Sequence, residues 1–222
     1  MKKPSNLKTI LTVLFTVCLI LSNIVTVKQV QLPFGITVTG AMVVFPVTYI
    51  LSDVFSEIYG YRWSRATCYI AFAMNLFTVL VFQLVIAMPA PSYFEGQKAL
   101  EMILGSVPRV LASSMMGLLA GDFVNDRVFR AMKKRHPDEL KGFGTRAILS
   151  SLAGEAADSA IFIPLAFIGT MPVGAMIIMG VSEVCVKVLY EVAVLPVTRR
   201  VCAAVGNHEK RTEGAYRVAE ES

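Results

Sequence analysis

Long apolar stretches constrain this chain more than any other feature of its sequence. Residues 66–88 contain no charged side chain, and about 20 apolar residues are enough to cross the hydrocarbon core of a membrane as a helix. Over the whole chain 55% of residues are hydrophobic and 17% are charged, whereas ordinary soluble domains contain about 25% charged residues. The composition therefore indicates a membrane protein and leaves no room for a sizeable soluble domain.

The apolar pattern predicts an all-α membrane protein with six transmembrane helices in a single domain over residues 1–200, followed by a polar cytoplasmic tail over residues 201–222. We expect the spans at about residues 9–27, 41–59, 66–88, 107–124, 145–168 and 173–198. Between spans, β-branched residues alternate in 28–40 and indicate a short extended piece. Charges at helical spacing in 89–106 indicate a short amphipathic helix at the surface.

Basic residues are distributed unevenly among the connections. Most of the 21 Lys and Arg residues lie at the amino terminus, in residues 60–65, in residues 125–146 and beyond the last span. The opposite side of the membrane receives Lys28, Lys98 and Arg109. Because basic residues accumulate on the cytoplasmic side, both termini are predicted to be cytoplasmic. The basic loops are interpreted as this topology signal, with no nucleic-acid partner.

Several charged residues lie inside the predicted spans, where each costs about 2.5–3.5 kcal/mol near the helix centre. Glu155 and Asp158 are three residues apart in the fifth span and share one helix face. Glu183, Lys187 and Glu191 form a stripe on the sixth span, in which Lys187 is able to pair with either acid. Two interpretations stay open: a structural ion-pair network, or a polar cavity enclosed by the second, fifth and sixth spans.

The candidate binding residues extend to the second span and to aromatic side chains. Tyr49, Asp53 and Glu57 follow one another at four-residue spacing, although Glu57 lies near enough to the span end to touch interfacial water. Aromatic rings in these spans offer faces for stacking on a flat ligand, or simply pack. The full set of candidate substrate-binding residues is Phe45, Tyr49, Asp53, Glu57, Glu155, Asp158, Phe162, Glu183 and Lys187.

Patterns for catalysis and for metal binding are missing from the sequence. Both histidines, His136 and His208, lie outside the predicted spans, and the four cysteines form no CxxC pair. There is no Walker-type GxxxxGK[ST] and no GxSxG elbow. We therefore predict no catalytic residue, no metal and no cofactor, and interpret the chain as a transport protein rather than an enzyme.

The paired carboxylates constrain the ligand to some extent. Two carboxylates side by side at low dielectric suit a small planar solute with adjacent N–H donors, such as a guanine-like edge, because such acceptance is directional and strong. The same acids also suit a proton, a sodium ion or an organic cation. Glycines and prolines inside spans would permit broken helices around such a site; they are Pro46, Gly117, Gly154, Pro164 and Pro196.

Four motifs give the chain a resemblance to a known family. The clearest is FPVTYILSDVFSEIYG at residues 45–60. In the same order follow GSVPR at 105–109, GEAADS at 154–159 with Phe162, and VKV at 186–188. Together these motifs resemble the queuosine precursor transporter family, also described as a vitamin-uptake-like family.

The resemblance implies a six-helix inner-membrane protein that imports 7-deazaguanine precursors of the tRNA base queuosine, namely 7-cyano-7-deazaguanine and 7-aminomethyl-7-deazaguanine. It also implies a size similar to that of the substrate-binding components of energy-coupling-factor transporters. Several members of the family carry Gln where this chain has Glu155, and the additional carboxylate is compatible with a preference for the cationic aminomethyl form. The ligand partner is then a flat solute, and the other partner is the lipid bilayer.

Three functional hypotheses follow from the sequence. The first is a self-sufficient carrier, the second a substrate-binding component that needs separate ATPase and coupling subunits, and the third a membrane scaffold whose buried charges only fix helix register. The preferred precursor, the coupling ion and a homo-oligomeric state are left open. Arg109, at the outer mouth, is expected either to guide ligand or to anchor the end of a helix.

Overall fold

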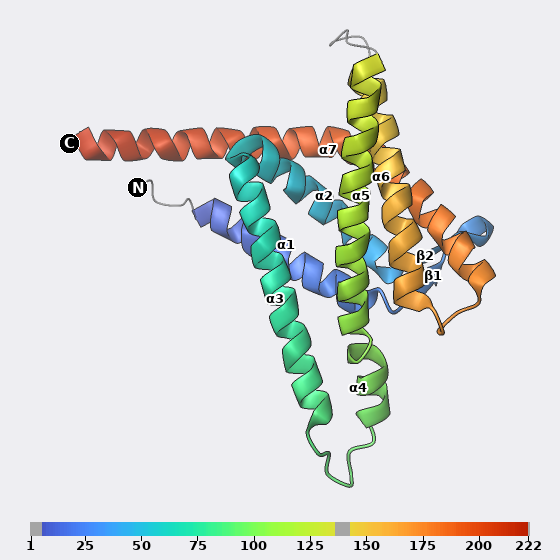
Figure 1. Ribbon diagram of the computed structural model, residues 1–222. Coiled ribbons are helices and arrows are strands. Elements are labelled where there is room, and N and C mark those ends of the chain that lie inside the picture. The colour runs from blue at the N-terminus through green and yellow to red at the C-terminus, as the bar shows by residue number, and fades with distance from the viewer. Residues whose placement is uncertain (1–5, 136–142, 222) are drawn as a thin grey trace. The chain divides into compact units, whose positions relative to one another are not determined.

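The computed structural model describes residues 6–135 and 143–221, and most of them are helical (Figure 1). The main elements are α1 (Asn6–Val25), β1 (Gln29–Gln31), β2 (Thr37–Thr39), α2 (Phe45–Val54), α3 (Tyr61–Ala87), α4 (Gln97–Leu104), α5 (Val107–Arg135), α6 (Phe143–Phe167) and α7 (Val173–Glu221). Two 3-10 turns, η1 (Pro33–Gly35) and η2 (Gly40–Val43), and a π-helical turn, η3 (Phe55–Tyr59), complete them.

Five helices of the described chain are long and apolar enough to cross a membrane. They are Asn6–Val25, Tyr61–Ala87, the stretch Gln97–Met132, Ile148–Phe167 and Val173–Glu191. Large apolar side chains are exposed along them, as in Leu80 and Leu84 of α3, which suits a lipid-facing surface. The prediction of an all-α membrane protein is confirmed at this level, whereas the sixth span stays a prediction.

The segment predicted as the second span is broken into three kinds of helix. Pro46 lies in the first turn of α2, where a missing N–H is tolerated, and α2 has only 10 residues. It widens into η3, and Gly60, at φ 80°, ends the helical run. π-helical turns are rare and frequently mark functional sites. In this segment the expectation of a broken helix near Pro46 fits the structure.

The chain forms two compact units. The first contains Met1–Ser22, Ala41–Val81 and Tyr190–Ser222, and the second contains Asn23–Gly40 and Phe82–Leu189. In the first unit, Phe15 and Phe55 meet edge to face with ring centroids 5.7 Å apart, inside a core that includes Leu51 and Ala71. Lys8 Nζ lies 3.5 Å from the centre of the Trp63 ring. Apolar packing and this cation–π contact stabilise the first unit.

Glycines bring α5 and α6 together in the second unit, where Figure 1 shows the two helices side by side. A Cβ atom on Gly121 would lie 3.0 Å from the Gly154 carbonyl oxygen, and one on Gly154 would lie 2.9 Å from Asn125 Cβ. Gly117 and Gly121 form a GxxxG pattern, which permits close backbone approach in membranes. The broken helices that Gly117 and Gly154 would permit are not formed, because both residues lie within continuous helices.

The internal prolines of the last two spans do not break them either. Pro164 lies inside α6, and Pro196 lies inside α7, which runs unbroken to Glu221. The polar tail that was predicted after residue 200 is helical as far as Glu221. A helix that loses one backbone hydrogen bond at proline persists when its neighbouring turns remain bonded.

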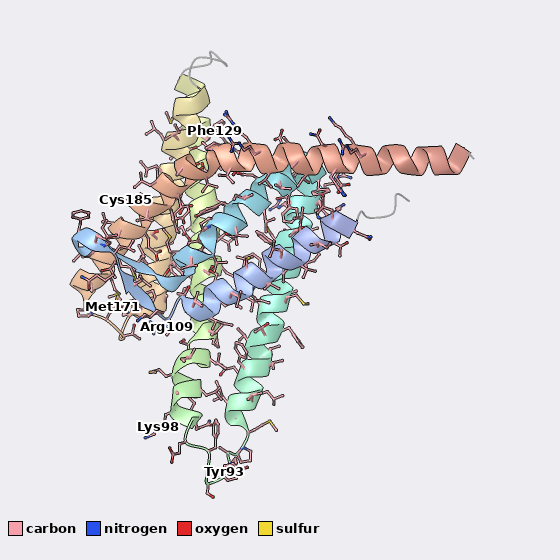
Figure 2. All side chains as sticks on the ribbon, turned by 180° about the vertical axis from the view of Figure 1, so that it is seen from behind. Tyr93, Lys98, Arg109, Phe129, Met171 and Cys185 are labelled. Carbon is pink, nitrogen blue, oxygen red and sulfur yellow. The ribbon has the colours of Figure 1, made fainter. Side chains whose placement is uncertain are left out.

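Arg109 of α5 fastens the end of α6. Its Nε donates to the Leu165 carbonyl at 2.6 Å and Nη2 donates to the Ile168 carbonyl at 2.7 Å. A guanidinium placed on the last carbonyls of a helix satisfies them and complements the helix dipole. Figure 2 shows Arg109 together with Met171, which follows α6 in the turn toward α7. The structure therefore gives Arg109 the role of an anchor.

Both predicted connections contain the expected elements. Residues Gln29–Gln31 pair antiparallel with Thr37–Thr39 in the register Val30 to Val38, which confirms the extended piece. Residues 97–104 form α4, and none of them is buried. Met102 in α4 is 69% exposed, as expected for a short amphipathic helix at the surface.

We predict that Gly121→Ala lowers the stability of the protein by about 1–3 kcal/mol, because overpacking forces the neighbouring backbone apart. Thermal unfolding of the detergent-solubilised protein measures this as a lower midpoint. Gly174→Ala is the matched control, since a Cβ there meets no atom within 4 Å and alanine favours helix. An equal midpoint for both variants would contradict the close α5–α6 contact.

Candidate functional site

Lys187 of α7 lies between the two carboxylates of α6. Its Nζ is 2.8 Å from Asp158 Oδ2 and 3.1 Å from Glu155 Oε2. The Lys187 side chain is 7% exposed, and those of Glu155 and Asp158 are 25% and 23% exposed. The three-residue spacing predicted that both acids share a face, and that face is turned toward Lys187. We call Glu155, Asp158 and Lys187 the charged cluster.

The charged cluster has an uneven charge balance. Two carboxylates face one ammonium group, so one formal negative charge is left when all three groups are ionised. At low dielectric such a cluster attracts cations and N–H donors strongly. The two contacts also differ, because Lys187 hydrogen-bonds to Asp158 while Glu155 Oε2 has no hydrogen-bond partner. Glu155 is therefore the more available acceptor.

Gly117 of α5 makes room for Asp158. A Cβ atom at Gly117 would collide with Asp158 Oδ1 and would lie 3.2 Å from Phe162 Cβ. The absence of a side chain at Gly117 thus allows the Asp158 carboxylate to sit against the α5 backbone. Sequence reasoning did not assign this role to Gly117, although the GxxxG spacing was a usable signal.

Glu183 lies one helical turn from Lys187 and is 1% exposed. Its Oε1 accepts the backbone N–H of Thr39, at the end of β2, at 3.0 Å. A hydrogen bond to a carboxylate is stronger than one between neutral groups, so it fastens the hairpin to α7. Glu183 was predicted to contact substrate, and the contact observed is structural. Thr39 was missed, because a backbone donor leaves no mark on the sequence.

The ring of Phe162 packs against other side chains of the protein rather than standing open to a ligand. Its ring meets Phe167 edge to face, with centroids 6.3 Å apart. It also lies against a core of Ile163, Ala166, Phe167, Met176 and Met179. These contacts favour the packing alternative for Phe162 over a role in binding a flat ring.

The remaining predicted residues belong to the first unit. Phe45 and Tyr49 have ring centroids 6.1 Å apart, and Asp53 and Glu57 are exposed. Cys202, which follows the predicted sixth span, has a raised pKa, first because it is partly buried and then because of the nearby carboxylates of Asp53 and Glu57. Asp53, Glu57 and Cys202 are therefore neighbours. A single cavity that also includes the charged cluster stays a prediction.

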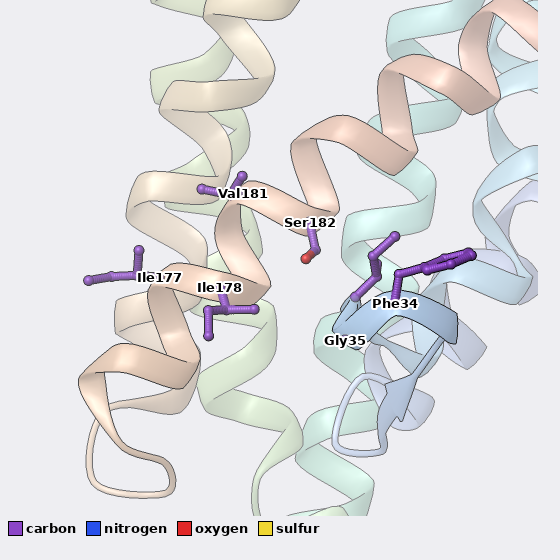
Figure 3. A pocket seen from close by; sticks show the side chains of 7 residues that line it. Phe34, Gly35, Ile177, Ile178, Val181 and Ser182 are labelled. Carbon is purple, nitrogen blue, oxygen red and sulfur yellow. The ribbon is translucent and has the colours of Figure 1, made fainter.

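An open pocket of about 340 Å³ lies elsewhere in the second unit (Figure 3). Its lining comes from the hairpin and from α7: Phe34, Gly35, Ile36, Ile177, Ile178, Val181 and Ser182. Apart from the Ser182 hydroxyl this lining offers no polar side chain. Polar solutes need convergent polar groups, so the charged cluster is the better candidate site. Among the residues that the structure describes, no group of three or more His, Cys, Asp or Glu suits a metal ion.

Several spanning helices with an ionic cluster buried between two of them define an integral membrane protein with a polar site. The chain belongs to the family described as "Putative vitamin uptake transporter", whose model matches residues 39–201. It is 27% identical over 199 residues to the "Probable queuosine precursor transporter" of Bacillus subtilis (strain 168). The alignment covers 88% of this chain and 83% of the relative. No solved structure matches the chain.

Family membership confirms the predicted resemblance and the interpretation as a transporter rather than an enzyme. It also confirms a multi-pass membrane protein, together with the apolar helices. The matched region, residues 39–201, includes every candidate site residue.

We predict that Lys187→Met destabilises the protein, by up to about 3–5 kcal/mol, because two partly buried carboxylates lose their counter-charge. Adding Glu155→Gln and Asp158→Asn is expected to recover most of this loss, since no unpaired charge then remains. The measurements are the thermal midpoint and the monodisperse yield in detergent. Lys98→Met, at an exposed position of α4, is the control, and equal stability of the single and triple variants would show that Lys187 does not neutralise these acids.

Proposed function

We propose that this chain imports 7-deazaguanine precursors of queuosine, namely 7-cyano-7-deazaguanine and 7-aminomethyl-7-deazaguanine, for the salvage of queuosine in tRNA. The observation that carries the proposal is the charged cluster, with Glu155 as an available buried acceptor. The named Bacillus relative supports the choice of solute.

The chemistry of the solute fits this cluster. A 7-deazaguanine presents a ring N–H beside an exocyclic amine, and a carboxylate accepts both in a bidentate arrangement. In a site screened from bulk water, these bonds are stronger than they are in solution. The single excess negative charge of the cluster also suits the aminomethyl form, which carries a positive charge.

The proposed topology has six crossings of the inner membrane with both termini in the cytoplasm. In it, η2, α2 and η3 together make the second crossing. Transporters commonly use such discontinuous helices at their binding sites, where irregular backbone lines a polar cavity. Asp53 and Glu57 would then lie near the cytoplasmic end of this crossing.

We propose a self-sufficient carrier, because the similar relative is named as a transporter. The absence of a Walker-type motif fits this carrier and the alternative equally well. The alternative is a substrate-binding component of an energy-coupling-factor type transporter. It predicts that ATPase and coupling subunits co-purify with the chain and that transport fails without them.

We predict that the chain restores queuosine to tRNA in cells that neither make nor import its precursors, when nanomolar 7-cyano-7-deazaguanine is supplied. Asp158→Asn is expected to remove most of this rescue, because Lys187 loses its hydrogen-bonded counter-charge. Queuosine is measured in digested tRNA by mass spectrometry. Asp126→Asn is the control, since Asp126 pairs with Arg130 at an exposed site.

The amount of each variant in the membrane fraction is measured in parallel. Full rescue by Asp158→Asn would show that the charged cluster takes no part in transport. Failure of the wild-type chain at a verified membrane level would contradict independent uptake of this solute.

A further inference from the structure

Ser159 of α6 has a buried hydroxyl without a hydrogen-bond partner. The residue is 3% exposed, and its Oγ makes no hydrogen bond. Other buried hydroxyls in these helices donate to the carbonyl four residues earlier: Thr16 to Thr12 at 2.9 Å and Ser113 to Arg109 at 2.7 Å. A buried hydroxyl with no partner is costly, and hydrocarbon offers none. Among the described residues, Thr67 of α3 shares this state, since its buried Oγ1 also has no partner, but only Ser159 lies on the helix that carries Glu155 and Asp158.

Glu155, one turn before Ser159, carries a second unpartnered atom. Its Oε2 is buried and has no hydrogen bond, despite the ion pair to Lys187. Residues four apart lie on the same helix face, with their Cβ atoms about 5–6 Å from each other. Thus one turn of α6 presents a carboxylate acceptor beside a hydroxyl, and both have unused bonding capacity.

Asp158 has less unused hydrogen-bonding capacity than Glu155 and Ser159. Its Oδ2 accepts a hydrogen bond from Lys187 at 2.8 Å, and its Oδ1 lies against the α5 backbone at Gly117. Asp158 is thereby fixed between two neighbouring helices, whereas Glu155 and Ser159 keep atoms for another molecule.

We infer that Glu155 and Ser159 together read the purine-like edge of the solute, an inference that rests on the proposed function. The Glu155 carboxylate accepts the ring N–H and the exocyclic amine, and the Ser159 hydroxyl donates to the ring carbonyl next to them. These three solute groups lie side by side on one edge, as do the two side chains on α6. Ser159 then determines specificity for solutes that carry the ring carbonyl, and Glu155 determines specificity for solutes that carry the exocyclic amine.

The test is a binding cycle between protein variants and solute analogues, on the full chain in detergent or nanodiscs. The probes are 7-cyano-7-deazaguanine, its 6-thioxo analogue and its 2-deamino analogue. The thioxo analogue keeps the ring N–H but replaces the carbonyl oxygen by a poor acceptor, and the deamino analogue lacks the exocyclic amine. Calorimetry or competition against labelled 7-cyano-7-deazaguanine gives Kd.

Ser159→Ala is expected to weaken binding of the parent solute about tenfold, as for the loss of one hydrogen bond to a buried partner. It should change the Kd of the thioxo analogue by much less. Glu155→Gln is expected to weaken the parent solute more than the deamino analogue, because the deamino analogue has only the ring N–H to give to this carboxylate. Ser151→Ala, on the same helix, serves as the control for serine removal.

A second readout separates recognition from structure. Because the Ser159 hydroxyl has no partner in the protein, Ser159→Ala without solute should unfold at the same or a higher temperature than wild type. A lower midpoint, or a loss of affinity that is equal for all three probes, would overturn the assignment of Ser159. If wild type binds none of the probes, the proposed function itself fails, before any variant is compared.

Discussion

The contact of Lys187 with Asp158 and Glu155 is the interaction on which the second unit depends. Each of these charges alone would be costly inside a membrane, so an alignment of α6 and α7 that brings them into contact is favoured. Lys187 and Asp158 are 29 residues apart in sequence, and they meet because α7 turns back directly after α6. The Arg109 side chain holds the end of α6 at that turn. The ion pairs thus favour this register of α6 and α7, while Arg109 holds the end of α6 against α5.

The glycines of α5 are a second condition for the same cluster. Apolar side chains at Gly117 and Gly121 would separate α5 from α6 and would displace Asp158. In lipid, helices associate chiefly through close packing and hydrogen bonds. The small residues therefore contribute twice, because they stabilise the α5–α6 pair and they leave space for a carboxylate where a larger residue would exclude it. Packing and binding chemistry are coupled at this position.

The sequence predicted those features that depend on local pattern. The uncharged apolar stretch 66–88 predicted the helix α3, because such a stretch has no other fold in a membrane. The spacing of Glu155 and Asp158 predicted that they share one helix face. Features that depend on distant partners were not predictable. The carboxylate of Glu183 accepts a backbone N–H 144 residues away, and every non-proline residue offers such a donor. The division of residues 41–59 into η2, α2 and η3 was missed too, because mean apolarity does not report how a backbone is hydrogen-bonded.

The two acids of the charged cluster are held unequally, and this inequality bears on how a solute is admitted and released. Asp158 has a hydrogen-bonded ammonium and the α5 backbone around it, so it keeps Lys187 in place. Glu155 has only the longer contact of 3.1 Å, with an oxygen that lacks a hydrogen bond. In the proposed function, a solute that bonds to Glu155 would therefore give up little of the ion pairing that stabilises α6 and α7. A carrier needs affinity that is specific but not tight enough to prevent release, and a weakly held acid beside a firmly held one meets both requirements.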